Sequence, residues 1–221
     1  MTKASAETEP ALFLHQVELG PMRNFVYLIG CEKTREAAVV DPAWDVPAIL
    51  KIAKDHRVQI KTILLTHTHF DHINGVEELL KQTDARVFVH KKEEAALRYG
   101  GGNIKKIESG DAVKVGDLNI TFIHTPGHTP GSQCFYVGDR LITGDTLFIN
   151  GCGRCDLPGG DPDEMYHSLT GTLKRLEDHT KVYPGHHYGD VPVSTLGDEK
   201  RRNPFLMSGS VEAFLRLTMG R

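Results

Sequence analysis

Cysteine is scarce in this sequence of 221 residues, which contains Cys31, Cys134, Cys152 and Cys155 and no others. So few cysteines in so long a chain exclude a fold that depends on disulfides. Long apolar runs are also missing, because no stretch approaches the about 20 apolar residues that a membrane-spanning helix needs. Residues 1–10 are polar and lack the apolar segment of a signal peptide. These absences predict a cytoplasmic protein with no membrane partner.

An excess of charge of one sign is absent too. The formal net charge is −3, and basic residues gather only in pairs such as Lys105-Lys106 and Arg201-Arg202. This balance gives no electrostatic footprint for nucleic acid or for an anionic membrane. With 39% hydrophobic and 25% charged residues, the composition is that of a globular protein. We expect residues 1–10 to form a flexible tail and residues 11–221 to form a single α/β domain, and the oligomeric state stays open.

Short apolar runs alternate with turn signals along the chain. They predict strands over residues 25–29, 36–40, 63–65, 86–90, 112–115, 118–123, 133–137, 141–143 and 182–183. Helical spacing and capping residues predict helices over 45–56, 76–82, 91–98, 161–177 and 195–202, with a last one from residue 210. The glycines at 100–102 predict a flexible loop. Asp161, Pro162 and Glu164 have the pattern of a helix start with a capping box. Strands that lead into loops with histidine and aspartate favour a layered α/β domain with its chemistry on those loops.

Histidine is abundant, with 12 residues, and one short motif holds four potential metal ligands. His67 and His69 come directly after a predicted buried strand, and Asp71 and His72 follow them. Such groups disfavour one another when they are buried together, unless a cation holds them. In an extended segment His67 and His69 share one face, whereas Asp71 and His72 lie past the bend. This layout favours two metal ions over one closed structural zinc, and the alternative is a polar loop that caps the next helix.

Three further candidate ligands lie in distant loops. His128 lies in the segment TPGHTPG, Asp145 follows a predicted strand, and His186 lies in the segment PGHHY. An isolated aspartate after a strand is more often a turn former, so each residue is a weak signal alone. Their order after the first motif makes the whole set a strong indication of a metal site. The neighbouring His124 and His187 are expected to pack or to support the ligands.

At these segments the chain resembles the metallo-β-lactamase superfamily, from about residue 13 to residue 205. It is most similar to the glyoxalase II branch and to the related persulfide dioxygenases, through the segments THTHFDH, TPGHTPGS, GDTLF, GCGR, PGHHY and NPF. The resemblance implies a four-layer αββα sandwich, with two mixed β-sheets face to face and helices outside. It implies one metal ion on His67, His69 and His128. It implies a second ion on Asp71, His72 and His186, with Asp145 as the bridge.

The leading functional hypothesis is a glyoxalase II-like metallohydrolase that cleaves a thioester such as an S-acylglutathione. Two divalent ions, of zinc or else of iron or manganese, would lower the pKa of a shared water to give a bound hydroxide, and would polarise the carbonyl. By resemblance Asp71 is both a ligand and the group that orients the nucleophile. By resemblance, too, Arg154 and Tyr188 hold a glutathione-derived substrate, because a guanidinium can clamp a carboxylate. The alternative for this pair is a surface arginine and a packed tyrosine.

The main alternative function is a persulfide dioxygenase that acts on glutathione persulfide. It would use one Fe(II) on His67, His128 and Asp145. The ligand motif does not separate the two enzymes, since the shortness of the chain and the segment GCGR fit the dioxygenase, whereas Phe70 and the segment GDTLF favour the hydrolase. A β-lactamase is disfavoured, because lactamases of this fold generally lack the bridging aspartate. A non-enzymatic metal-binding module would have to keep seven ligands without chemistry.

Cys152 and Cys155 have the C-x-x-C spacing of redox and zinc-binding pairs. No second pair is present to complete a zinc site with them. The resemblance covers Cys152 but not Cys155, so the spacing is interpreted as incidental.

Overall fold

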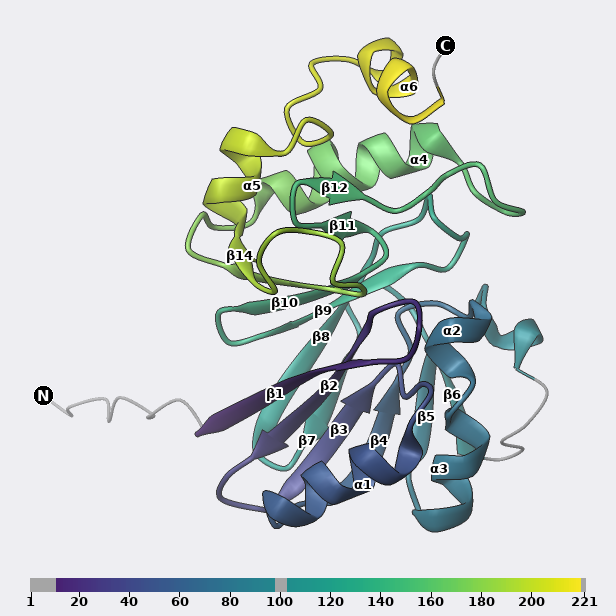
Figure 1. The fold of residues 1–221 in the computed structure, drawn as a ribbon, viewed down its shortest axis with the longest axis vertical. Helices are drawn as coiled ribbons and strands as arrows, with labels where there is room; N and C mark the ends of the chain where they lie inside the picture. Colours follow the sequence, from purple (N-terminus) through teal and green to yellow (C-terminus); the bar gives the residue numbers. More distant parts are fainter. Residues whose placement is uncertain (1–10, 98–102, 220–221) are drawn as a thin grey trace, which may run out of the picture.

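A computed structural model describes residues 11–97 and 103–219, and two six-stranded sheets form its centre (Figure 1). The first sheet contains, in spatial order, β1 (Leu12–Leu19), β2 (Asn24–Cys31), β3 (Glu36–Val40), β4 (Gln59–Leu64), β5 (Arg86–His90) and β6 (Ile104–Ile107). Strands β1, β2 and β3 pair antiparallel, whereas β3, β4, β5 and β6 pair parallel. The sheet is therefore mixed.

The second sheet is built from the later part of the chain. It contains, in spatial order, β14 (Ser194–Thr195), β13 (Lys181–Pro184), β10 (Arg140–Gly144), β9 (Gln133–Val137), β8 (Leu118–His124) and β7 (Ala112–Val115). This sheet is also mixed, because β10 and β13 are parallel and the other neighbours are antiparallel. A small two-stranded ribbon of β11 (Leu147–Phe148) and β12 (Gly151–Cys152) follows β10.

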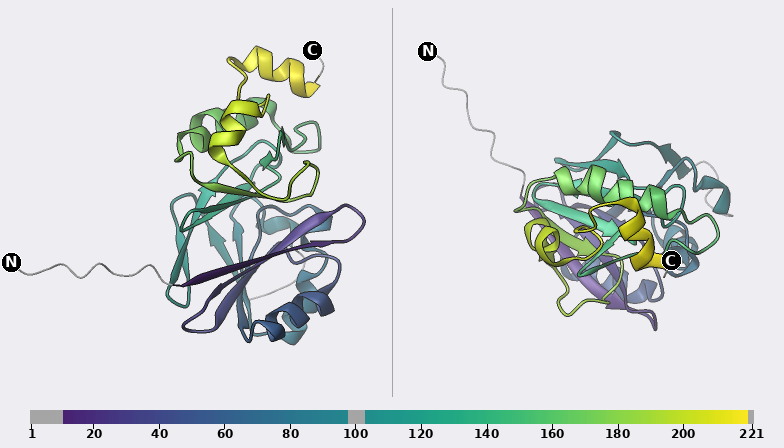
Figure 2. Two further views of the ribbon diagram at one scale, coloured as in Figure 1. Left: turned by 60° about the vertical axis from the view of Figure 1, so that its left-hand side comes forward. Right: turned by 90° about the horizontal axis from the view of Figure 1, so that it is seen from above.

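Helices cover the outer sides of both sheets (Figures 1 and 2). Helices α1 (Val46–Asp55) and α3 (Val76–Gln82) lie on the first sheet. On the second sheet lie α4 (Pro162–His167), α5 (Leu196–Arg202) and α6 (Val211–Met219). The layers are thus helix, sheet, sheet and helix, which confirms the expected αββα sandwich.

The side chains of the strands explain why three apolar layers form. At the end of β4, Ile63 and the next residue after the strand, Leu65, pack beneath α1 and α3, whereas Leu64 faces the second sheet. Alternate residues of a strand point to opposite faces, so a strand that is covered on both sides is apolar throughout. Phe122 and Phe135 pack with Leu64 in the apolar layer between the two sheets. Because this layer holds the sheets face to face, the loops at one end of both sheets lie close together. The loops at those ends carry the candidate ligands.

The structure corrects two of the expected helices. Residues 91–97 form turns and a single 3₁₀ turn, η1 (Glu94–Ala96), instead of an α-helix over 91–98. The helix predicted over 161–177 is α only from Pro162 to His167, and then becomes a π turn over Ser168–Thr172 and a 3₁₀ turn over Leu173–Arg175. Gly171 lies in the changed part, where glycine weakens an α-helix. Strands β1, β6, β11, β12 and β14 were not expected from the sequence.

The expected helix start at Asp161 is present in part. Its side chain accepts hydrogen bonds from the backbone amides of Asp163 and Glu164. Its own amide donates to the carbonyl of Gly127 instead of completing a capping box, at 2.8 Å. The expected tail over 1–10 and the glycine loop at 100–102 lie outside the described residues. Among the described helices, none has the length and apolarity to cross a membrane.

Candidate metal centre

All seven expected metal ligands lie close together at one end of the two sheets. They occupy the loop after β4, the short helix α2 (Phe70–Ile73), the loop between β8 and β9, the end of β10 and the loop after β13: His67, His69, Asp71, His72, His128, Asp145 and His186. The first four come from the first sheet and the last three from the second. The fold therefore brings together residues that are up to 119 positions apart, from 67 to 186.

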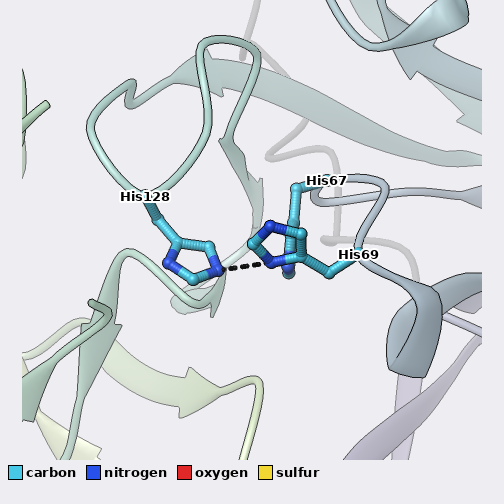
Figure 3. A group of neighbouring side chains, drawn as sticks. All are labelled: His67, His69 and His128. Carbon is cyan, nitrogen blue, oxygen red and sulfur yellow. Dashed lines mark hydrogen bonds between the residues drawn. The ribbon is translucent and has the colours of Figure 1, made fainter. Parts of the chain in front are cut away.

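Three histidines form the first cluster, which Figure 3 shows. The ligand atoms of His67, His69 and His128 all lie within 4.8 Å of one another. Nε2 of His128 lies 2.8 Å from Nδ1 of His69. Each ring is perpendicular or nearly so to its neighbours, so their nitrogen atoms converge on one point instead of stacking.

A carboxylate and two histidines form the second cluster. Nε2 of His72 lies 3.1 Å from Nε2 of His186. Oδ2 of Asp71 lies 3.5 Å from Nε2 of His72 and 3.4 Å from Nε2 of His186. This is the grouping that the family resemblance implies for a second ion.

Asp145 lies between the two clusters and contacts both. Its Oδ2 lies 3.5 Å from Nε2 of His128 in the first cluster and 3.3 Å from Nε2 of His186 in the second. Its Oδ1 lies 3.4 Å from Nε2 of His72. A carboxylate can offer one oxygen to each of two cations, so Asp145 stands where a bridging ligand would be needed.

Hydrogen bonds on the far side of three rings determine which nitrogen faces the centre. Nδ1 of His128 donates to the carbonyl of Arg154, and Nδ1 of His186 donates to the carbonyl of Met22. Nδ1 of His72 donates to Oδ2 of Asp41 at 3.0 Å. A neutral ring that carries its proton on Nδ1 has a lone pair on Nε2. The facing Nε2 atoms of His72 and His186 therefore need either a proton or a metal ion between them.

The spacing and the unpaired atoms of the site fit divalent metal ions. Nitrogen ligands of one tetrahedral zinc lie about 3.3 Å apart, close to the separations seen here. Nε2 of His67 and Oδ1 of Asp145 are buried without a hydrogen-bond partner. Buried polar atoms are nearly always paired, so two such atoms in one site indicate a ligand that both of them bind.

The electrostatic field of the site also favours cations. Burial disfavours the charged form of His72, but the carboxylates of Asp145, Asp41 and Asp71 outweigh this effect and raise the pKa of His72 to about 9. Burial and the neighbouring His72 hold the pKa of His67 well below its usual value. The carboxylates of this buried site thus stabilise positive charge.

Three residues that support the candidate ligands were not predicted from the sequence, and two of them act on the second cluster. Asp41 directly follows β3 and has a positive φ of 49°; it accepts hydrogen bonds from the amide and the hydroxyl of Thr66 as well as from His72. Asn24 donates to Oδ2 of Asp71 at 2.9 Å and fixes that carboxylate. The position of Asp41 after a strand and before a proline was a visible signal, whereas nothing in the sequence links Asn24 to Asp71.

A third supporting residue, Glu93, joins the two loops of the first cluster. Its side chain is buried, and it accepts a hydrogen bond from the hydroxyl of Thr68, which lies between His67 and His69. It also accepts one from the amide of Gly131, in the loop of His128, at 2.8 Å. Only glycine fits at 131, because a Cβ there would lie 2.4 Å from Cγ of Glu93.

An open pocket of about 420 Å³ lies over the ligands, and it contains both expected substrate-binding residues. The guanidinium of Arg154 donates two hydrogen bonds of 2.8 Å to the carboxylate of Asp156. The ring of Tyr188 stacks on His186, with centroids 4.6 Å apart and planes 9° apart. Tyr188 is 54% exposed, so its hydroxyl-bearing ring is accessible from the pocket.

The remaining histidines and cysteines that were considered lie outside the ligand set. His124 stacks on His90 and bonds to the carbonyl of Pro130, and Nδ1 of His187 pairs with Glu18. Burial raises the pKa of Cys152 well above its usual value. Burial also raises the pKa of Cys155, to about 12. Burial thus disfavours the thiolate form that redox chemistry at this pair would need.

Comparison with known proteins gives a family match and close relatives. The sequence model of the Metallo-beta-lactamase superfamily matches residues 19–186. The "Probable polyketide biosynthesis zinc-dependent hydrolase PksB" from Bacillus subtilis is 32% identical over 87% of this chain and 86% of its own length. The "Probable hydroxyacylglutathione hydrolase glo2" from Schizosaccharomyces pombe is 32% identical over 86% of this chain and 85% of its own length.

A solved structure shares most of the fold. The crystal structure of ETHE1 from Myxococcus xanthus superposes with a TM-score of 0.84 and 34% sequence identity. The match covers 93% of this chain and 89% of that one. The similarity in fold therefore extends over most of the chain.

Proposed function

The chain belongs to the metallo-beta-lactamase superfamily, and on that premise we propose that it is a metal-dependent thioester hydrolase with two divalent ions. The observation that carries the proposal is the position of Asp145. Its two oxygens contact His128 of the first cluster and both His72 and His186 of the second. A single shared carboxylate between two complete three-residue clusters is the arrangement that a dinuclear site needs.

The chemistry follows from what the residues can hold. Divalent ions bound to the two clusters would activate water and polarise a carbonyl group. Asp71, fixed by Asn24, orients the attacking water in this scheme. Addition of water to the thioester carbon breaks the carbon–sulfur bond and gives a carboxylate and a free thiol.

Glutathione is the thiol carrier that we propose, with Arg154 and Tyr188 as its binding residues. Relatives described as hydroxyacylglutathione hydrolases support this choice, and the zinc-dependent hydrolase PksB supports hydrolysis with zinc as the metal. Asp156 already pairs with Arg154, but an exposed ion pair contributes only about 0–1 kcal/mol. A carboxylate of the substrate can therefore replace Asp156.

The direct test measures the hydrolysis of S-acylglutathione by protein that has been stripped of metal and then reloaded with zinc. We expect hydrolysis to depend on the added ion. Arg154→Ala should raise KM several-fold and leave the metal content unchanged. An inactive zinc-loaded enzyme, tested over a range of thioesters, would contradict the hydrolase, and an unchanged KM in Arg154→Ala would remove glutathione as the carrier.

A second candidate function, a persulfide dioxygenase, draws on a different observation. The two buried unpaired ligand atoms belong to His67 and Asp145, which are two of the three residues that would hold a single Fe(II). Oxygen consumption with glutathione persulfide by iron-loaded protein, measured beside the thioester assay, separates the two functions.

A further inference from the structure

The pocket over the metal ligands has an apolar rim. Among the described residues, six large hydrophobic side chains are exposed, and three of them line this pocket: Met22 at 44%, Phe70 at 72% and Tyr188 at 54%. Phe148 and Leu157 also line it. Exposed apolar side chains that gather at one place, and not singly over the surface, usually mark a binding site.

The aromatic parts of this rim are held in place by their neighbours. Phe70 contacts the ring of Trp44 edge to face, with centroids 6.1 Å apart. The indole of Trp44 donates to Asn24 at 2.8 Å, so it cannot turn away. Tyr188 lies flat on His186 and edge to face on Phe148. Side chains that already pack on a neighbour lose less conformational entropy when they bind a ligand than free ones do.

Positive charge at the rim is already neutralised. Arg154 is the one lysine or arginine that lines the pocket among the described residues, and it pairs with Asp156. Arg23, next to Met22, pairs with Glu18. Away from the metal ligands and the carrier contacts, the rim of the pocket thus offers an apolar surface and no unpaired lysine or arginine.

We propose that the acyl group of the substrate is apolar and lies against Met22, Phe70 and Leu157. This inference rests on the proposed function for the identity of the thioester, but the apolar wall can be tested by binding alone. The proposal therefore specifies the substrate class. The enzyme would prefer thioesters whose acyl group is a long alkyl chain or an aryl group over thioesters whose acyl group is short or carries a hydroxyl.

The kinetic test keeps glutathione constant and varies the acyl group. With wild-type protein we expect kcat/KM for the hexanoyl thioester to exceed that for the acetyl thioester by about tenfold or more. The propanoyl thioester should be preferred to the lactoyl thioester, which differs from it by one hydroxyl.

Met22→Ser should move the ratio of the two kcat/KM values, hexanoyl to acetyl, towards one. Met207→Ser, a matched change at another exposed methionine, should leave the ratio unchanged. Selection of acetyl or lactoyl by the wild type would overturn the inference.

A binding test separates this inference from the hydrolase itself. S-hexylglutathione and S-methylglutathione are thioethers without a carbonyl, so they cannot be hydrolysed. Calorimetry should show about tenfold tighter binding of the hexyl compound to wild type, and loss of that difference in Met22→Ser. Equal binding of both compounds overturns the apolar wall. A clear difference without cleavage of any thioester keeps the wall and removes the hydrolase.

Discussion

Asp145 is the residue on which the two-ion proposal depends, because its oxygens reach both clusters. Asp145→Asn keeps the size of the side chain but removes its charge and one acceptor oxygen. Substitutions of residues that only support a metal ligand cost about 10–100-fold in affinity or activity, so the loss of a ligand should cost at least about a hundredfold in kcat/KM. Metal content should fall below that of the wild type, as elemental analysis would measure.

The matched control is Asp139→Asn. Asp139 lies a few residues earlier, in the turn before β10, where it pairs with Arg140 and Lys181 at the surface. This variant should keep the activity and the metal content of the wild type. If Asp145→Asn behaves like Asp139→Asn, the bridging role is wrong.

The sequence alone predicts the candidate ligands, which the structure brings together, whereas it does not predict the residues that hold these side chains in place. Four ligands stand in one short motif, and chemistry alone explains why they would share a cation. Asp41, by contrast, acts through a positive φ of 49° that turns its carboxylate towards both Thr66 and His72. Asn24 acts through a contact across 47 positions. The only local sign of the backbone angle is the place of Asp41 between a strand and a proline, and the contact of Asn24 leaves no local pattern in the sequence.

At the scale of elements, the segment after β5 tests how the first cluster is held. Glu93 joins the loop of His69 to the loop of His128 through Thr68 and Gly131. Glu93→Ala removes both hydrogen bonds and should weaken the binding of one ion about 10–100-fold, as supporting residues of metal sites do. Glu93→Gln should restore much of this affinity. The amide oxygen of the glutamine can accept from the backbone amide of Gly131, and its NH₂ group can donate to the hydroxyl oxygen of Thr68. Zinc titration against a chelator measures the loss, and the visible spectrum of the cobalt-substituted protein reports any change of geometry.

Glu94→Ala is the control for this element, because Glu94 pairs only with Lys106 at the surface among the contacts described. Its zinc affinity and cobalt spectrum should match those of the wild type. A Glu93→Ala protein that binds both ions as tightly as Glu94→Ala does would show that Glu93 has no part in holding the loops.

The same segment shows why one element was predicted wrongly. Residues 91–98 have helical spacing, but the buried carboxylate of Glu93 is drawn inward by Thr68 and Gly131, and this tertiary contact outweighs a weak helical preference. Where local and tertiary preferences agree, as at α1, the prediction is confirmed. Asp45 caps that helix, and Val46, Ile49 and Ala53 face the core.

At the scale of the whole molecule, the metal site connects the two sheets. Ligands from the loop after β4 belong to the first sheet, and ligands after β8, β10 and β13 belong to the second. An ion that binds the folded chain and not the unfolded one stabilises the fold by about 4 kcal/mol at a thousandfold excess over its Kd. Removal of metal should therefore lower the Tm by about 10 °C, as calorimetry would measure. An equal Tm with and without chelator would mean that the ions do not hold the sheets together.

The sandwich itself could be predicted because the motifs resemble a known family, and the comparisons confirm that family. The alternation of strands and helices alone predicts only that the domain is a layered α/β structure. The pairing of β1 with β2 and the position of β6 at the edge of the first sheet depend on contacts between distant segments. Hydrophobic periodicity reports which face of a strand is buried, but not which strand lies beside it.

The central claim, a dinuclear site, is tested most directly by the metal content of protein that is produced without added metal. Elemental analysis should find about two ions of zinc, iron or manganese per chain, because two clusters share Asp145. A single iron per chain, with little other metal, would contradict the dinuclear hydrolase and favour the mononuclear iron enzyme on His67, His128 and Asp145.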